Sequence, residues 1–130
     1  MPIPTGTELA RPFVPARDLE LSKRFYEALG FTKLLDSEVA IFRAGRESAF
    51  ILTPYDVPEH AGHFMMQLMV DDLDAWWAHL VALDLAAKFG VTTLKAPAAQ
   101  PWGLRVAFVS DPSGVLWHIA QRREGKPHDR

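Results

Sequence analysis

Residues Val14–Phe31, which read VPARDLELSKRFYEALGF, are the stretch that decides the fold of this 130-residue chain. An apolar segment leads directly into an acidic helix start. Leu21, Phe25 and Leu29 then recur every four residues, which is the spacing of one buried helix face. Asp18 stands where its carboxylate can accept from the free N–H groups of the first turn. The stretch therefore predicts a strand followed by a capped amphipathic helix.

The same phrase occurs a second time. Asp18 and Leu19 recur 54 positions later as Asp72 and Leu73, again after an apolar stretch and at the start of a helix-like run. Two copies are too few for a solenoid, which needs about three to bury a continuous core. The repeat predicts two similar half-units that share one sheet, with a binding site between them.

Each half is expected to contain one long helix and several short strands. In the first half we expect strands at Glu8–Val14, Phe31–Asp36, Val39–Arg43 and Ser48–Thr53, with the helix starting at Asp18. In the second half we expect strands at His63–Val70, Phe89–Leu94, Leu104–Ser110 and Val115–Gln121, a helix from Asp72 to Leu83 and a loop at Ala96–Pro101. The pattern predicts a single α+β domain over 1–130, with modules at about 8–53 and 63–121, a linker at 54–62 and a frayed tail at 122–130.

The bulk composition excludes several classes of function. The net charge is −2, and no long run of Lys or Arg is present, whereas nucleic-acid binding needs a basic stripe. No apolar run approaches the roughly 20 residues of a membrane span. The absence of cysteine excludes disulfides, thiolate catalysis and cysteine zinc sites. With no signal-peptide pattern at the N-terminus, a cytoplasmic location is expected.

Three phrases in combination resemble the vicinal oxygen chelate superfamily of glyoxalases, bleomycin-resistance proteins and dioxygenases. They are Val14–Phe31 with its DLxxSxxFYxxLGF pattern, the helix start Val70–Asp74, and Phe108–Gly114 with its DPxG turn. The resemblance covers about residues 8–121 and is nearest in kind to the bleomycin-resistance proteins. It implies two βαβββ modules that form a curled mixed sheet around a cleft, paired within one chain or across a dimer with exchanged modules.

Many members of that superfamily hold a divalent metal with one His, Gln or Glu on each of four strands. By the resemblance, these positions fall on Arg11, Ile51, Met65 and His118. Only His118 is a competent ligand, and the permanent cation of Arg11 repels a divalent metal. We therefore expect no metal and no other cofactor.

A rearranged metal site is the alternative. His63 and Gln67 share one strand face by the two-residue period, and His118 would lie across the cleft, with Glu47 or Glu59 as a further ligand. Such a set would serve a metal-dependent lyase, isomerase or dioxygenase. These residues lack the spacing of a metal-binding motif. The simpler interpretation is that His63 caps the start of a strand, Gln67 forms hydrogen bonds within the core and His118 is a neutral imidazole in the pocket.

The remaining cleft residues suit a ligand rather than a metal. Trp102 lies in a Pro-Trp-Gly loop, where it can stack on a flat molecule. Arg11 either forks onto a carboxylate or phosphate of a ligand, or points to solvent without a role. The predicted ligand site consists of Arg11, Phe13, Ile51, Met65, Gln67, Trp102 and His118.

The sequence thus favours a metal-independent binding protein over an enzyme. It would sequester a drug or toxin, aromatic or anionic, as antibiotic-resistance proteins of this kind do. If it is an enzyme, a glyoxalase-type lyase or a dioxygenase is expected; a regulatory domain without a tight ligand is a third possibility. The expected assembly is a homodimer, with Trp76 near a contact, and neither nucleic acid nor membrane is an expected partner.

Overall fold

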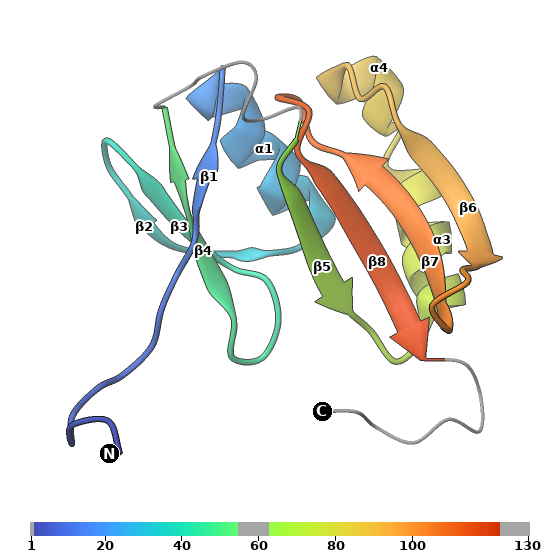
Figure 1. Ribbon diagram of the computed structural model, residues 1–130. Helices are drawn as coiled ribbons and strands as arrows, with labels where there is room; N and C mark the ends of the chain where they lie inside the picture. The colour runs from blue at the N-terminus through green and yellow to red at the C-terminus, as the bar shows by residue number, and fades with distance from the viewer. Residues whose placement is uncertain (1, 55–62, 123–130) are drawn as a thin grey trace.

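The computed structural model describes residues 2–54 and 63–122, which form two four-stranded mixed sheets with helices packed against them (Figure 1). The first module contains β1 (Phe13–Pro15), α1 (Leu19–Leu29), β2 (Thr32–Asp36), β3 (Ala40–Arg43) and β4 (Ala49–Thr53). The second contains β5 (Met65–Met69), α3 (Leu73–Ala82), α4 (Leu85–Phe89), β6 (Leu94–Ala99), β7 (Leu104–Ser110) and β8 (Leu116–Arg122). The predicted α+β class is confirmed, and so is the doubled βαβββ order apart from the additional helix α4. The two half-units form two sheets rather than the one shared sheet that the repeat predicted.

The two sheets have the same topology. Their strand orders are β1-β4-β3-β2 and β5-β8-β7-β6, so the first strand of each module pairs with the last. These two pairings are parallel, with Phe13 opposite Ile51 and Gln67 opposite His118, whereas the remaining pairings are antiparallel. A parallel pair needs a crossover connection, which the helix supplies in each module.

The repeated Asp-Leu phrase is structural. Asp18 accepts from the backbone N–H of Leu21 at 3.1 Å, and Asp72 accepts from that of Ala75 at 3.0 Å. Each carboxylate satisfies one of the free N–H groups at a helix start and lies favourably at the positive end of the helix dipole. The predicted caps are confirmed, and the same local device begins both modules.

One buried cluster receives side chains from both modules. Its largest members surround Tyr26 of α1, whose ring centroid lies 5.0 Å from that of Phe50 and 5.8 Å from that of Trp117. Phe50 is on β4 and Trp117 is on β8, so the helix of the first module packs on residues of both sheets. The two modules therefore share one core.

One predicted strand and one predicted loop in the second module are wrong. The segment that was expected to be a strand at Phe89–Leu94 instead ends helix α4, because Leu85–Lys88 are good helix formers and Gly90 stops the helix at φ 69°. Strand β6 begins at Leu94 and runs to Ala99, so it occupies most of the segment that was expected to be a loop at Ala96–Pro101. An edge strand tolerates Pro97, and the pairing of β6 with β7 shifts between Lys95 and Ala98.

The ends of the modules also differ from expectation. The first strand is Phe13–Pro15 rather than Glu8–Val14, because its pairing partner β4 begins only at Ala49, opposite residue 11. Strand β8 reaches Arg122, one residue into the expected tail. Residues 123–130 and most of the expected linker lie outside the described residues. Within residues 2–54 and 63–122, no helix is long and apolar enough to cross a membrane.

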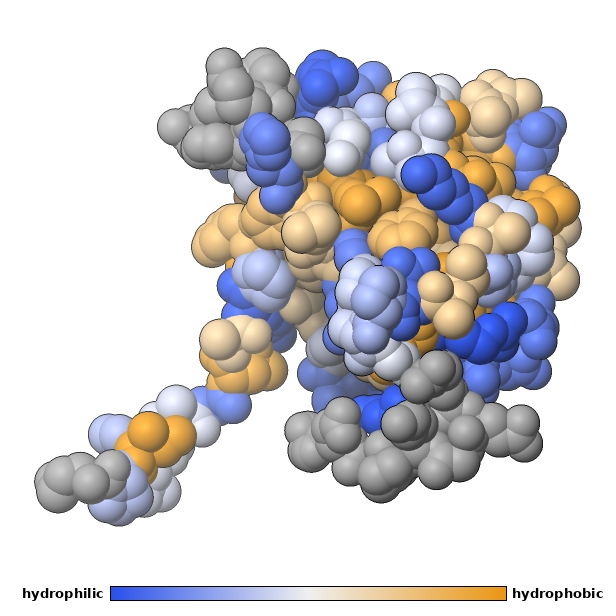
Figure 2. All heavy atoms as spheres, turned by 45° about the vertical axis from the view of Figure 1, so that its right-hand side comes forward, coloured by the Kyte–Doolittle hydropathy of each residue, from blue (hydrophilic) through white to orange (hydrophobic). Residues whose placement is uncertain are grey.

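Each sheet is covered by helices on one face only. Val14 and Leu52 are fully buried, so by alternation Phe13 and Ile51 face the other way. Phe13 is 61% exposed, and Met65 is 62% exposed on the second sheet. We call these uncovered sides the open faces of the two sheets. Figure 2 shows hydrophobic side chains at the molecular surface, which a solitary soluble protein rarely leaves uncovered in a large patch.

Candidate functional site

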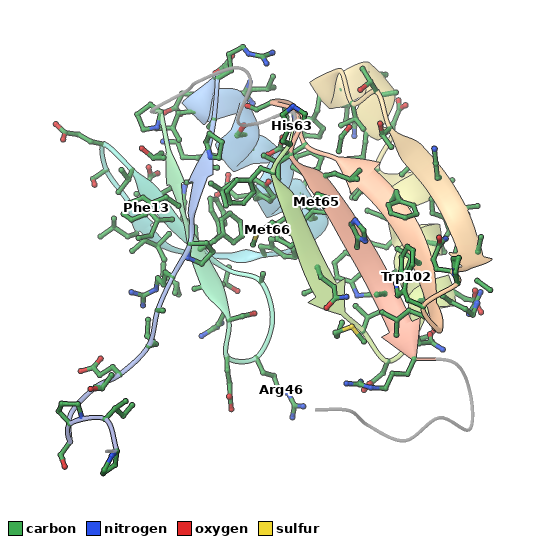
Figure 3. The ribbon with its side chains drawn as sticks, in the orientation of Figure 1. Phe13, Arg46, His63, Met65, Met66 and Trp102 are labelled. Atoms are coloured by element: carbon green, nitrogen blue, oxygen red, sulfur yellow. The ribbon has the colours of Figure 1, made fainter. Side chains whose placement is uncertain are left out.

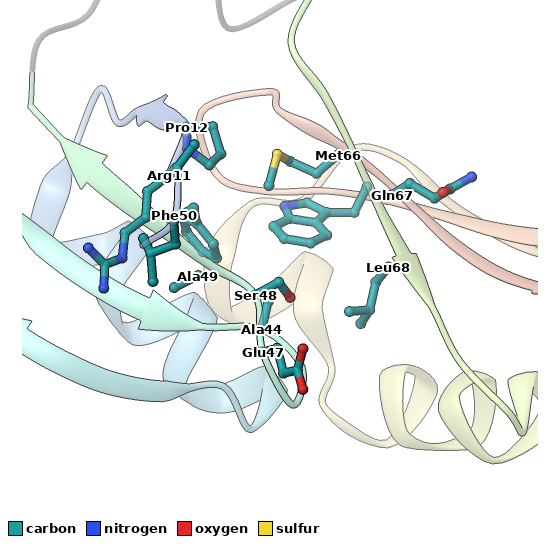
Figure 4. A pocket seen from close by; sticks show the side chains of 13 residues that line it. Arg11, Pro12, Ala44, Glu47, Ser48, Ala49, Phe50, Met66, Gln67 and Leu68 are labelled. Carbon is teal, nitrogen blue, oxygen red and sulfur yellow. The ribbon is translucent and has the colours of Figure 1, made fainter. Parts of the chain in front are cut away.

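A pocket of about 350 Å³ lies at the junction of the two modules (Figure 4). It opens between the segment that precedes β1 and the edge strand β5, with the β3–β4 turn along one side. Most of its wall is apolar and includes Pro12, Phe50, Met66, Leu68 and Trp117. The polar side chains that line it are Arg11, Glu47, Ser48 and Gln67. The pocket therefore has an aromatic and thioether wall with a few polar groups, as small-molecule sites commonly do.

The polar groups of this pocket lie at its rim. Figure 4 shows Met66 pointing toward Pro12 and Phe50, whereas the guanidinium of Arg11 and the amide of Gln67 are directed away from Met66. Within the described part of the chain, neither Arg11 nor Glu47 has an ion-pair partner. A ligand that enters between the modules would meet an apolar interior and free charges at the mouth.

The wall residue Trp117 belongs to a buried hydrogen-bond chain. Its indole Nε1–H donates to the hydroxyl oxygen of Tyr26 at 2.9 Å, and that hydroxyl donates to Oδ2 of Asp111 at 2.6 Å. Burial raises the pKa of the Asp111 carboxyl, although the hydrogen bond from Tyr26 opposes this shift. Burial, with the nearby charge of Asp111, raises the pKa of the Tyr26 phenol well above its usual value. Tyr26 therefore stays protonated at neutral pH.

The open face of the second sheet carries a second group of candidate site residues. Gln67, His118 and Phe108 lie side by side in register on β5, β8 and β7. The Nε2 atom of His118 is buried and has no hydrogen-bond partner among the described residues. Burial lowers the pKa of His118, so its imidazole is neutral at pH 7. This face presents an aromatic pair and one unsatisfied imidazole nitrogen.

Two further predicted site residues lie on the same side of this sheet. Figure 3 shows Met65 of β5 and Trp102 of the β6–β7 turn on the side facing the viewer, with α3 behind the sheet. Trp102 is 58% exposed, which is unusual for so large an apolar side chain. The loop keeps the indole at the surface and available for stacking.

One chain does not bring the seven predicted site residues together. Arg11 and Gln67 line the pocket between the modules. The open face of the second sheet holds Met65, His118 and Trp102, and that of the first holds Phe13 and Ile51.

The sequence prediction missed the apolar wall of the pocket, including the rings of Phe50 and Trp117. Strand alternation assigned Trp117 to a helix-covered face, and the fully buried Phe50 has the same orientation. Both rings are buried in the structure, yet the gap between the sheets lets them line a pocket as well. Glu47 was considered only as a metal ligand, although it lies at the rim. The sequence did carry one signal for the location of this pocket. β1 and β5 are each the first strand of a module, so the chain near them could be expected to border the junction between the modules.

The side chains at the inherited metal positions do not fit a divalent metal. Arg11, Ile51, Met65 and His118 present a guanidinium, a hydrocarbon, a thioether and one imidazole, whereas such a metal needs several N or O donors. In the described ranges no group of three or more His, Cys, Asp or Glu side chains converges on one point. His63 is exposed at the start of β5, and Glu59 lies outside the described residues.

Comparison with known proteins gives consistent matches. The profile of the Glyoxalase/Bleomycin resistance protein/Dioxygenase superfamily matches residues 8–119. A bleomycin resistance protein of Klebsiella pneumoniae is 28% identical over 117 residues, which cover 88% of this chain and 93% of that protein.

Solved structures agree. The crystal structure of a bleomycin-binding protein complexed with bleomycin is 30% identical, with a TM-score of 0.71 over 90% of this chain and 100% of the other. TnmS3, an antibiotic binding protein from Streptomyces sp. CB03234, is 28% identical, with a TM-score of 0.71 over 91% of this chain and 98% of its own.

Proposed function

Because the chain belongs to the glyoxalase/bleomycin resistance protein/dioxygenase superfamily, we propose that it is a metal-independent binding protein that sequesters a drug or toxin. The similar proteins named above bind bleomycin or another antibiotic or confer resistance to bleomycin, and they match along most of their length. A superfamily fold by itself does not determine function, so the proposal depends on the residues of the site. Their chemistry favours a flat molecule with an anionic or hydrogen-bonding group.

The observation that carries this proposal is the unsatisfied Nε2 atom of His118, which lies beside the ring of Phe108 on the open face of the second sheet. A buried polar atom without a partner is unfavourable, and native proteins keep few of them. A ligand that donates a hydrogen bond to this nitrogen would satisfy it. Phe108 and Trp102 on the same side of the sheet would contact a planar group of that ligand.

We include a homodimer in the proposal, because the open faces expose apolar side chains that a second copy would cover. In a dimer whose open faces meet, Phe13 and Ile51 of one protomer would lie near Met65, His118 and Trp102 of the other. That arrangement would unite residues that one chain keeps apart. Trp76, which was expected near a dimer contact, is half-buried against the core, with its ring 6.4 Å from that of Phe31.

Isothermal titration of the purified protein with metal-free bleomycin tests the proposed function. We expect saturable binding with a micromolar or lower Kd, which corresponds to about −8 kcal/mol or better. Quenching of tryptophan fluorescence should accompany binding if Trp102 stacks on the drug. The absence of heat and of quenching with bleomycin and with other aromatic antibiotics would contradict the proposal.

Two finer expectations stay predictions. One is that the protein confers antibiotic resistance, which is tested by comparing the growth of bleomycin-treated bacteria that express the wild type or a non-binding variant. The other is a cytoplasmic location, which cell fractionation tests. No arrangement among the described residues favours the alternative of a metal-dependent lyase, isomerase or dioxygenase.

A further inference from the structure

The buried chain of Trp117, Tyr26 and Asp111 permits only one direction of hydrogen bonding. An indole N–H can only donate, so the hydroxyl oxygen of Tyr26 must accept from Trp117 at 2.9 Å. The single hydroxyl hydrogen of Tyr26 is then left for Oδ2 of Asp111 at 2.6 Å. The other oxygen, Oδ1, accepts from the backbone N–H groups of Ser113 at 2.8 Å and Val115 at 2.9 Å. Each polar group in this chain is satisfied by the next one.

The chain crosses from one module to the other. Tyr26 is on α1 of the first module, whereas Asp111 and Trp117 belong to the second, 85 and 91 positions later. All three side chains are buried, and Trp117 is only 1% exposed. Of the three, Trp117 alone lines the pocket between the modules. The Tyr26 hydroxyl does not line the pocket, but it is hydrogen bonded to the Trp117 ring, which does.

Ring packing alone leaves the orientation of this indole less well determined. The Trp117 ring lies 5.5 Å from that of Phe50, at 60°, and 5.4 Å from that of Phe31, at 56°. Such aromatic contacts tolerate a range of angles, whereas a hydrogen bond at 2.9 Å constrains the position of Nε1. Without the Tyr26 hydroxyl, the indole N–H would be buried without a partner and the ring would have reason to turn.

We propose that Tyr26 and Asp111 are positioning residues for ligand binding, which hold the Trp117 ring as a wall of the pocket between the modules. This pocket then serves as the subsite for a flat aromatic group, with Arg11 at the rim for an anionic substituent. The inference rests on the proposed function in one respect, namely that the protein binds a small molecule, and it adds a subsite apart from the open face of the second sheet. It adds that the shape of the subsite depends on the contact between the two modules.

Binding of naphthalene-1-sulfonate, an aromatic anion of the proposed class, tests the inference in ¹⁵N-labelled protein. The four tryptophans give four indole N–H signals, and the variant Trp117→Phe assigns that of Trp117. Titration should shift this signal in the wild type. Tyr26→Phe should weaken binding at least fivefold, measured at a temperature where each protein is fully folded.

A matched variant separates positioning from general destabilisation. Leu80→Val removes one methylene from a fully buried side chain on α3 that does not line the pocket, so it lowers stability without touching the hydrogen-bond chain. We expect its Kd to stay within twofold of wild type. Equal Kd values for Tyr26→Phe and Leu80→Val, or a Trp117 signal that the probe does not shift in wild type, would overturn the inference. A protein that binds the probe in this way but not bleomycin would overturn only the proposed function.

Discussion

The imidazole of His118 meets the ring of Phe108 edge to face, with centroids 4.7 Å apart and planes inclined at 71°. The contact places an aromatic surface beside a nitrogen that has no partner within the described residues. Because burial lowers the pKa of His118, the unfolded chain binds a proton at this side chain more readily than the folded protein does. His118 therefore lowers the free energy of unfolding as the pH falls below 6.5, the pKa of its imidazole in the unfolded chain.

We predict that His118→Leu weakens bleomycin binding without loss of stability. The variant removes the group proposed to accept from the ligand, which is worth roughly 1 kcal/mol, or about a fivefold to tenfold change in Kd. It also removes an unsatisfied buried nitrogen, so the free energy of unfolding should be equal or higher. Calorimetric titration and urea unfolding measure the two effects. His63→Leu, at an exposed position, is the control; equal losses of affinity in both variants would contradict the assignment.

Trp102→Ala should separate binding from folding even more clearly. The side chain is 58% exposed, so its removal should change the free energy of unfolding by no more than about 0.5 kcal/mol. Loss of a stacking surface should weaken bleomycin binding about fivefold or more, and the quenching of fluorescence should decrease with it. The control is Val81→Ala, which shortens another exposed apolar side chain on the far side of the second sheet. Unchanged quenching in Trp102→Ala would show that the fluorescence change on binding comes from another tryptophan.

Acid stability should depend on Asp36. Its carboxylate accepts from Lys23 and Lys33, both at 2.8 Å, and these hydrogen bonds lower the Asp36 pKa to about 2. Since this value is below the unfolded value of 3.8, the ion pairs stabilise the fold above pH 4, and this stabilisation is lost as the pH falls from 4 to 2. Asp36→Asn should therefore flatten the acid limb of the stability curve, measured by urea unfolding at several pH values. Glu38→Gln should leave that limb unchanged.

The proposed dimer predicts a specific effect at Phe13. This side chain is 61% exposed on the open face of the first sheet, so Phe13→Asp would place a charge in the interface without disturbing the core. Sedimentation velocity at about ten micromolar should show a dimer for the wild type and a monomer for the variant. Val81→Asp introduces the same charge at a 54% exposed position on α3 and should remain dimeric. A monomeric wild type would contradict the proposal.

Metal removal should leave binding unchanged. We expect no stoichiometric transition metal in protein purified without chelators, and the same Kd for bleomycin before and after dialysis against EDTA. The reason is the donor set at the inherited positions, where Arg11, Ile51 and Met65 replace the usual N and O ligands. Retention of one metal ion per chain, lost in His118→Leu, would favour the alternative site of His63, Gln67 and His118. Mass spectrometry of the metal content decides between them.

The scaffold was predictable because its signals are local. Asp18 and Asp72 cap the helices that follow them, and the apolar spacing after each cap predicts one buried face. The segment after Leu83 was not predictable in the same way. Its apolar residues fit a strand or a short helix equally well. In the structure they form helix α4, which runs from Leu85 to Phe89 and is capped by Gly90. Strand β6 was missed because Pro97 is typical of a loop.

The site was less accessible to sequence reasoning than the scaffold. Strand alternation could place Met65 and Gln67 on one face, but His118 was expected across the cleft, whereas it lies beside Gln67 on the neighbouring strand of the same sheet. Alternation could not show that Phe50 and Trp117, buried under helices, also line a pocket, because this depends on how far apart the two sheets lie. The partner of the Tyr26 hydroxyl is 85 positions away, so no local pattern identifies it.

The separation between Tyr26 and Asp111 has a consequence for biosynthesis. At about 5–20 residues per second, a ribosome would reach Asp111 roughly 4–17 s after Tyr26. During that interval Tyr26 of α1 lacks both the carboxylate of Asp111, which accepts its hydrogen bond, and the indole of Trp117, which packs against its ring. The nascent first half must therefore wait for the last strands with its aromatic surface uncovered, which makes this period of translation its most vulnerable to aggregation.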